Sequence, residues 1–113
     1  MRTLELLIIL PFILLTTCKK IEKDTPDCIN SLIKNNQSAM FLCETGASVS
    51  QYSFQGAYVY VFEPGNCGAD MMSDVYSSDC ELLGGLGGIA GNSIINGVRF
   101  DQKATFIKTI WTN

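Results

Sequence analysis

The sequence predicts an α+β domain in which one N-terminal helix covers a small antiparallel sheet, with glycine-rich loops and disulfides. Three observations lead to this prediction. Apolar residues recur at helical spacing in residues 28–33, a period of two runs through residues 49–62, and five glycines fall within residues 84–91. A helical period followed by strand periods, with turn residues between them, is typical of an α+β fold.

The start of the chain has the layout of a secretory signal. A short basic start with Arg2 precedes an apolar stretch at residues 6–15, and Leu15-Thr16-Thr17 then leads to Cys18. The apolar stretch is shorter than the roughly 20 residues that a helix needs to span a bilayer. We therefore expect a cleaved signal. A short membrane anchor is the alternative.

A leucine and two small residues before Cys18 resemble the lipobox of bacterial lipoproteins. The resemblance implies that the Cys18 thiol receives diacylglycerol, that cleavage occurs before it, and that the new amine is acylated, for example with palmitate. We expect residues 1–17 to be removed, residues 18–24 to form a charged tether, and residues 25–113 to form one extracytoplasmic domain. The expected location is the cell envelope. We favour the outer membrane and leave its periplasmic and surface faces open.

The four other cysteines predict two disulfides, because an exported chain meets an oxidising compartment. They are Cys28, Cys43, Cys67 and Cys80. Of three possible pairings we favour Cys28 with Cys43 and Cys67 with Cys80, since each closes a loop of about 15 residues and contributes about 3 kcal/mol from chain entropy. A zinc site is the alternative, but the chain has no histidine and no CxxC pair.

The first element is a helix that ends near Lys34. Thr25 can cap its first turn, Pro26 suits the first helical position, and Asp27 carries a negative charge at the positive end of the helix dipole. The apolar residues that follow form one stripe, so the helix should lie on the core. We expect the asparagines at Asn35 and beyond to end it.

Residues 49–62 predict a β-hairpin that turns at Gln55-Gly56. Its second strand is apolar on both faces, which predicts a central place in the sheet with the helix on one side. Short strands are expected at residues 74–76 and 81–83. Residues 104–111 are rich in β-branched and aromatic residues and predict a closing strand, with a helix as the alternative.

The glycine run invites comparison with phosphate-binding loops, but the required partners are missing. A P-loop needs a lysine after its last glycine, whereas the next lysine after Gly91 is Lys103. A dinucleotide motif can be written from Gly85 to Ala90, but it needs a βαβ unit and an acid about twenty residues further on. We therefore expect no cofactor and assign the glycines to turns and close packing.

Acidic residues in the same half of the chain are weak candidates for a calcium site. They are Asp70, Asp74, Asp79 and Glu81. Calcium prefers several carboxylate and carbonyl oxygens, but the EF-hand spacing is absent, so we interpret these acids first as turn caps.

With no histidine and no nucleophile motif, an enzyme is disfavoured. The net charge of −3 gives nucleic-acid binding no electrostatic support.

Turn glycines, cysteines and strand residues in the second half of the chain carry a further resemblance. They are Gly56 with Val59-Tyr60, Cys67 with Asp70, Val75-Tyr76 ahead of Cys80, Gly87-Gly88-Ile89 with Gly91, and Trp111. This pattern is similar to that of a family of short Bacteroidota-type lipoproteins whose domain has no assigned function. The resemblance implies an envelope location and transfers no catalytic residue.

We therefore expect a lipid-anchored binding or accessory module of the cell envelope. Its partners would be membrane lipid through Cys18 and an envelope protein. An exposed aromatic patch could include Tyr52, Tyr58, Tyr60 and Trp111, with a place in the core as the alternative. The alternative functions are a small calcium-binding domain or enzyme that uses the acidic, glycine-rich half, and a structural envelope component.

Overall fold

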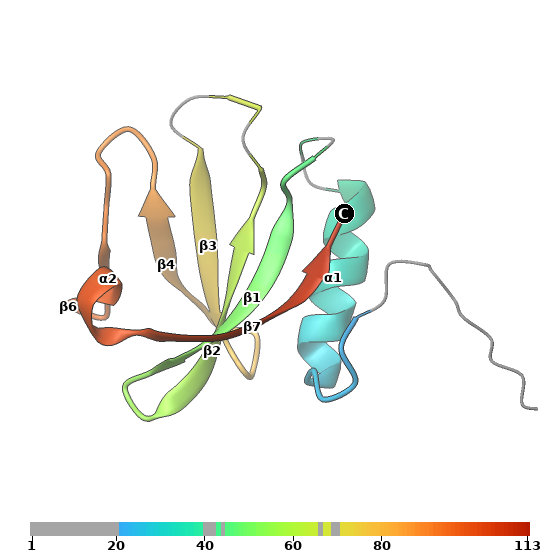
Figure 1. The fold of residues 1–113 in the computed structure, drawn as a ribbon, viewed down its shortest axis with the longest axis horizontal. Helices are drawn as coiled ribbons and strands as arrows, with labels where there is room; N and C mark the ends of the chain where they lie inside the picture. The colour runs from blue at the N-terminus through green and yellow to red at the C-terminus, as the bar shows by residue number, and fades with distance from the viewer. Residues whose placement is uncertain (1–20, 40–42, 44, 66, 69–70) are drawn as a thin grey trace, which may run out of the picture.

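The computed structural model describes residues 21–39, 43, 45–65, 67–68 and 71–113 (Figure 1). Its elements are α1 (Asp27–Ala39), β1 (Ser48–Phe54), β2 (Ala57–Glu63), β3 (Met72–Ser77), β4 (Leu82–Gly87), β5 (Ile94–Ile95), β6 (Val98–Arg99), α2 (Phe100–Lys103) and β7 (Thr105–Thr112). Antiparallel strands form one sheet in the order β4-β3-β2-β1-β7, and β5 pairs with β6. The predicted α+β class is confirmed.

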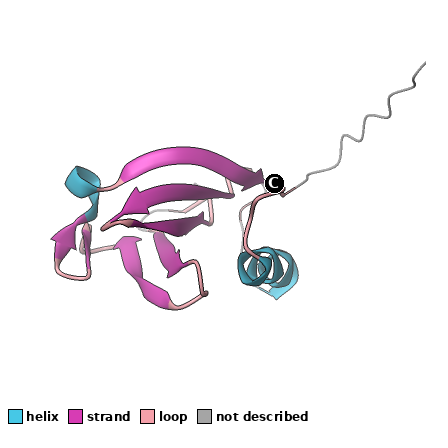
Figure 2. Ribbon diagram, turned by 90° about the horizontal axis from the view of Figure 1, so that it is seen from below, coloured by secondary structure: helices cyan, strands magenta, loops and turns pink. Residues whose placement is uncertain are grey.

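Helix α1 covers one face of the sheet, which we call the helix face. Ile29 and Ile33 are buried there against a cluster that includes Val49, Tyr60 and Trp111. Figure 2 shows α1 beside the curved sheet, with α2 at the far end of the molecule. The amphipathic stripe predicted from the sequence is therefore the surface by which α1 packs.

The ends of α1 differ from the prediction by several residues. The helix begins at Asp27, and the carbonyl of Pro26 accepts its first hydrogen bond, from Asn30, so Pro26 precedes the helix. Thr25 donates its hydroxyl to the Glu22 carbonyl at 2.7 Å. The expected end near Lys34 is wrong, since the helix continues to Ala39. Asparagine is only a mild helix breaker, and neither glycine nor proline follows it here.

Strand β2 occupies the centre of the sheet and is buried on both faces, as predicted. Tyr60 and Phe62 join the cluster under α1. Val59 and Val61 join a second cluster on the opposite face, where Phe100 is also buried. Because side chains alternate along a strand, a strand that is apolar throughout needs cover on both sides.

Two tight hairpins have the backbone of type I′ turns. Gln55 and Gly56 join β1 to β2 with φ of 53° and 78°, which confirms the predicted turn. Asn96 and Gly97 join β5 to β6 with φ of 53° and 76°. The second hairpin was not predicted, although Asn-Gly is a strong signal for this turn. It places Ile95, 1% exposed, in the core.

Half of the glycine run is a strand rather than a loop, which corrects the prediction. Gly84, Gly85 and Gly87 belong to β4 and pair with β3 at one edge of the sheet. A Cβ atom on Gly85 would lie 2.8 Å from the terminal carbon of Met72. The absence of side chains therefore lets Met72 lie against the strand, and backbone pairing outweighs the weak strand propensity of glycine.

The closing strand is confirmed, and the helical alternative for residues 104–111 is wrong. β7 pairs with β1 and lies at the opposite edge of the sheet from β4. The first described residues reach this edge: the Glu22 amide donates to the Ile110 carbonyl at 3.2 Å, and its carboxylate lies 3.8 Å from the Lys108 ammonium.

The two predicted disulfides are present, but the pairing we favoured is wrong. Cys28 pairs with Cys80, and Cys43 pairs with Cys67. The first turn of α1 lies over the turn between β3 and β4, whereas Cys43 and Cys67 flank the open end of the β1–β2 hairpin. The disulfide pairing thus follows from which elements the fold brings together and not from the length of the loop that each bond closes. From chain entropy, closing the 52 residues between Cys28 and Cys80 stabilises the fold by about 4 kcal/mol.

Digestion without reduction should distinguish this pairing from the one we favoured. A glutamate-specific protease that cuts after Glu44 and Glu81 leaves Cys28 and Cys43 in one fragment and Cys67 and Cys80 in another. The observed pairing joins the two fragments, so mass spectrometry should find them as one species that separates on reduction. Two separate fragments, each with an internal bond, would contradict the structure.

Candidate functional site

The sheet face opposite α1 carries two adjoining hollows of about 440 and 390 Å³. They share Glu63, Met71, Ser73 and Gly87, so we treat them as one groove. We call this side of the sheet the groove face. Each hollow has the size of typical small-molecule sites, about 300 to 1,000 Å³.

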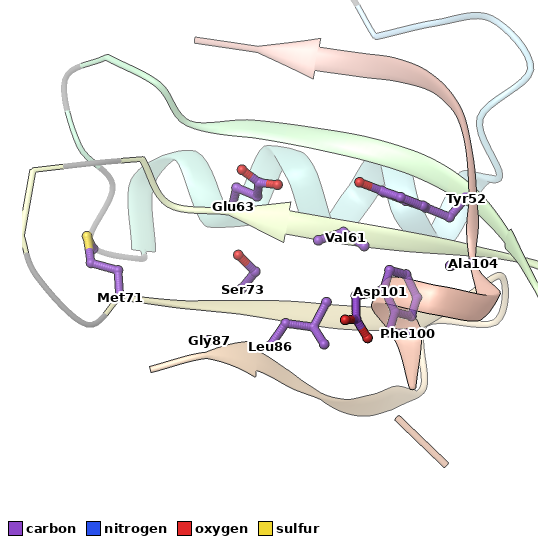
Figure 3. A pocket seen from close by; sticks show the side chains of 10 residues that line it. All are labelled: Tyr52, Val61, Glu63, Met71, Ser73, Leu86, Gly87, Phe100, Asp101 and Ala104. Carbon is purple, nitrogen blue, oxygen red and sulfur yellow. The ribbon is translucent and has the colours of Figure 1, made fainter. Parts of the chain in front are cut away.

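One end of the groove is aromatic. Tyr52 comes from β1 and Phe100 from α2, with ring centroids 5.1 Å apart. Phe106 of β7 lies edge-on to Tyr52 at 5.6 Å, and Phe54 lies 4.9 Å from Phe100. These contacts hold the Tyr52 ring from both sides, and Figure 3 shows its hydroxyl directed along the groove. The hydroxyl is therefore positioned before any ligand arrives.

The other end of the groove is polar. Glu63 ends β2 two residues after the buried Val61, and Ser73 lies on β3 two residues before the buried Val75, so alternation places both on the groove face. Figure 3 shows the Glu63 carboxylate and the Ser73 hydroxyl on the side toward which Tyr52 points. Three oxygen-bearing groups from three strands thus converge on one space.

The electrostatics of the groove centre on Glu63. Burial raises the pKa of the Tyr52 phenol, and the negative charge of Glu63 raises it further. Tyr52 is therefore neutral at physiological pH and can donate or accept a hydrogen bond. Among the described residues, the Glu63 carboxylate forms no ion pair.

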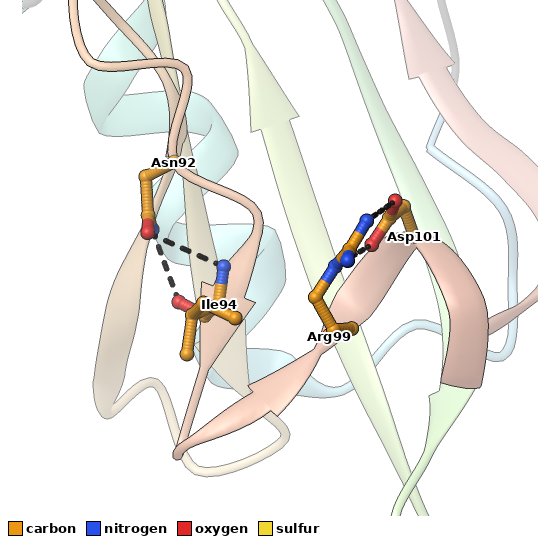
Figure 4. A network of polar contacts seen from close by, with 4 residues as sticks. All are labelled: Asn92, Ile94, Arg99 and Asp101. Atoms are coloured by element: carbon orange, nitrogen blue, oxygen red, sulfur yellow. Dashed lines mark hydrogen bonds and ion pairs between the residues drawn. The ribbon is translucent and has the colours of Figure 1, made fainter.

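The second carboxylate of the groove already has a cationic partner. The Arg99 guanidinium donates to the two carboxylate oxygens of Asp101 at 3.1 and 2.7 Å (Figure 4). These hydrogen bonds hold the pKa of Asp101 below its usual range. No lysine or arginine lines either hollow within the part of the chain that the structure describes. Among the described residues that line the groove, Glu63 is therefore the uncompensated charge.

Glycine backbone forms the far wall of the groove, where Gly65, Gly68, Gly87 and Gly88 line the second hollow. Gly65 has φ of 114°, and a Cβ atom there would lie 2.6 Å from Cβ of Cys43. This position requires glycine because the chain is pressed against the Cys43–Cys67 disulfide. The disulfide therefore supports one wall of the groove.

The acids expected to bind calcium are not brought together. Asp70 lies outside the described residues, and no group of three potential metal ligands occurs among the residues that are described. Asp79 and Glu81 do not cap their turn as we expected. Instead, the Ser77 hydroxyl accepts hydrogen bonds from both of their backbone amides, at 3.2 and 3.1 Å. A hydroxyl at the strand end is the nearer acceptor.

Asp74 lies on the helix face of β3, on the opposite side from Ser73. Burial raises the pKa of its carboxyl group. Burial also raises the pKa of Tyr76, and the nearby Asp74 charge adds to this effect. Asp74 forms no ion pair with a described residue, so its ionised form is poorly compensated. Burial of this charge therefore lowers the stability of the fold, and Asp74 does not belong to a group of metal ligands among the described residues.

The four aromatic residues singled out from the sequence do not form one patch. Tyr60 and Trp111 are 2% and 6% exposed and belong to the core, which confirms the structural alternative for these two. Tyr60 accepts a buried hydrogen bond from the Gln51 amide at 3.0 Å. Tyr58 is exposed, and only Tyr52 lines the main hollow.

Sequence reasoning did not single out Glu63, Ser73 or Phe100. For Glu63 a signal was present, because the alternation of β2 continues to this acid at its end. Phe100 follows the Asn-Gly hairpin, which would have indicated a chain reversal back toward the sheet. Ser73 had no signal, since its role depends on the pairing of β3 with β2 and β4.

The expected lipidation site, Cys18, lies outside the described residues. Within the part that is described, no helix combines the length and apolar character needed to span a membrane. A family described as "Domain of unknown function (DUF6970)" matches residues 33–113. No curated protein and no solved structure is similar enough to match the chain.

Replacing Asp74 by asparagine should stabilise the protein at neutral pH. A raised folded-state pKa means that the fold gains stability when Asp74 is protonated and loses it as pH rises through that pKa. Asp74→Asn removes the charge, so its melting temperature should exceed that of the wild type at pH 7. The difference should vanish below the ordinary aspartate pKa of about 3.9.

The matched control for this prediction is Asp79→Asn, which changes an exposed acid on the turn after β3. This control should melt like the wild type at both pH values. A lower melting temperature for Asp74→Asn at pH 7 would show that the Asp74 carboxylate stabilises the fold, contrary to the prediction.

Proposed function

We propose that this chain, which belongs to the DUF6970 family of domains of unknown function, is a lipid-anchored binding module of the bacterial cell envelope. The groove is its proposed ligand-binding site. The observation that carries the proposal is the convergence of the Tyr52, Glu63 and Ser73 oxygens beside a preformed apolar floor. A concave apolar surface with a few converging polar groups is the usual form of a binding site.

The place where the tether joins the fold supports this function. Ile21 packs against the cluster under α1, and Glu22 pairs with the outer edge of β7. The groove lies on the other face of the sheet, and Figure 1 shows α2 at the opposite end of the sheet from α1. An anchor that holds the chain upstream of Ile21 would therefore leave the groove open to its surroundings.

Binding accounts for the groove better than catalysis. General acid–base catalysis requires a group whose pKa is adjusted toward the working pH. Here the pKa of Asp101 is lowered by Arg99, and that of Tyr52 is raised away from neutrality. The positioned groups are thus suited to hold a ligand by hydrogen bonds and charge.

The anchor can be tested at Cys18. The wild-type precursor should mature to a membrane-bound protein whose intact mass includes acyl chains, and Cys18→Ala should not be processed in this way. The matched control is Thr16→Ala, which keeps a small residue in the lipobox and should behave like the wild type. Membrane fractionation with intact mass spectrometry distinguishes the outcomes. Acylated, membrane-bound Cys18→Ala protein would contradict the anchor.

The groove can be tested with three small probes that share one aromatic body: phenethylamine, phenethyl alcohol and phenylacetate. At least one should shift the methyl NMR signals of Val61 and Leu86, which line the main hollow. The mature chain can be held in phosphatidylcholine nanodiscs, with empty nanodiscs to correct for partitioning. If none of the probes shifts these signals, the groove is not a binding site.

A groove-filling variant makes this test specific. Ser73→Tyr places a ring in the groove near the start of β3 and should abolish the shifts. Ser31→Tyr adds the same side chain at an exposed position of α1 and should leave them unchanged. Melting temperatures of the two variants exclude unfolding as the cause. Equal shifts in both variants would place the probes elsewhere.

A further inference from the structure

We infer that the groove takes a cationic amphipathic ligand, in which a primary ammonium or guanidinium group meets Glu63 and an apolar body lies toward Tyr52 and Phe100. This inference rests on the proposed binding function and names the chemical class of its ligand. The positively charged group could belong to a free amine or to a lysine or arginine side chain of a peptide.

The charge of the groove is the first argument. Glu63 is uncompensated, whereas Asp101 is held by Arg99. A ligand that covers Glu63 removes water from its carboxylate, and an ionised group that loses water without a partner is costly. An anion would add repulsion to this cost. Only a cation both replaces the lost water and neutralises the charge.

The number and kind of acceptors are the second argument. An ammonium group has three N–H donors and no acceptor. Glu63 and Ser73 come from neighbouring positions of the paired strands β2 and β3, and the Tyr52 hydroxyl points toward this end of the groove from β1, so oxygen acceptors line the space where the ammonium would bind. The Tyr52 hydroxyl forms no hydrogen bond with a described residue, so it is available to a ligand.

The apolar floor is the third argument. Val61, which is buried, and Leu86, which is half-buried, lie between the polar end and the aromatic end. In Figure 3 these side chains lie between Ser73 and the α2 end of the groove. A ligand that consisted of a charge alone would leave this surface uncovered. An apolar stem attached to the cation would cover it, and an aromatic body would also meet the Tyr52 ring.

The second hollow bears on the source of the cation. It continues past Glu63 along the backbone of Gly65, Gly68, Gly87 and Gly88, which have no side chains of their own. Gly87 and the Gly88 amide already form hydrogen bonds within the fold, so an extended peptide would pair with the backbone at Gly65 and Gly68. A small amine has no backbone with which to form such a pair. A peptide would therefore use both hollows, whereas a free amine would use only the first.

The three matched probes test the inference through their order of affinity. Phenethylamine should bind more tightly than phenethyl alcohol, and phenylacetate should bind most weakly. The advantage of the amine should fall when salt is raised, because the contact is partly exposed. If the alcohol or the carboxylate binds as tightly as the amine, the cationic class is wrong while the binding function stands. If no probe binds, both fail.

Variants identify the residues responsible. Glu63→Gln should weaken phenethylamine binding about threefold to fivefold, the range for a partly exposed ion pair, and leave phenethyl alcohol unaffected. Tyr52→Phe keeps the ring contacts and removes only the hydroxyl, so it should weaken the amine selectively. The control Glu81→Gln, outside both hollows, should bind like the wild type. Unchanged amine affinity in Glu63→Gln would overturn the inference.

A final comparison separates the two sources of the cation. The blocked tripeptide N-acetyl-glycyl-lysyl-glycine amide carries its only cation on the lysine side chain, and acetylation of that lysine removes the charge. Tighter binding of the charged tripeptide than of phenethylamine indicates a peptide ligand, and weaker binding indicates a free amine. Equal binding of the charged and acetylated tripeptides, with no preference among the phenethyl probes, would overturn the cationic class.

Discussion

The burial of β2 on both faces is the constraint on which the rest of the structure depends. Residues 58–62 of β2 are all aromatic or β-branched. If either face of the strand were exposed, the apolar burial on that face would be lost. On the helix face, α1 covers β2 with its apolar stripe. On the groove face, the cover that the described residues provide is the β5–β6 hairpin and α2, which contribute Ile95 and Phe100. The groove is the part of this second face that so short a cover leaves open.

At the two edges of the sheet, residues outside the sheet form hydrogen bonds with the edge strands β4 and β7. Asn92 donates its side-chain amide to the Gly85 carbonyl at 2.6 Å and exchanges backbone bonds with Gly87 at 2.8 and 3.0 Å. The same amide contacts the Ile94 carbonyl (Figure 4). On the other edge, Glu22 covers β7 at Ile110. Unpaired strand edges favour aggregation, so these contacts protect a short domain.

Local patterns in the sequence predicted the main elements, but they did not predict how distant elements pair. The hairpin at Gln55-Gly56, the two-faced β2 and the closing strand each depend on neighbouring residues, and each was predicted. The disulfides depend on α1 crossing to the β3–β4 turn, and the strand character of Gly84 and Gly85 depends on pairing with β3. Glu63, Ser73 and Phe100 meet only after the sheet has formed. A site assembled from three elements leaves no contiguous motif to read.

Because the Cys43–Cys67 disulfide supports the groove wall, the shape of the groove depends on the compartment in which the chain matures. Cys43 and Cys67 join the segment before β1 to the segment after β2, and Gly65 packs directly on Cys43 at the groove wall. Such bonds persist in oxidising compartments, which agrees with the export expected from residues 1–18. In a reducing compartment the wall would lose its support while both clusters around β2 kept their packing. Reduction would also remove the stabilisation of about 4 kcal/mol from the Cys28–Cys80 bond, so both the shape of the groove at Gly65 and the stability of the fold depend on where the chain matures.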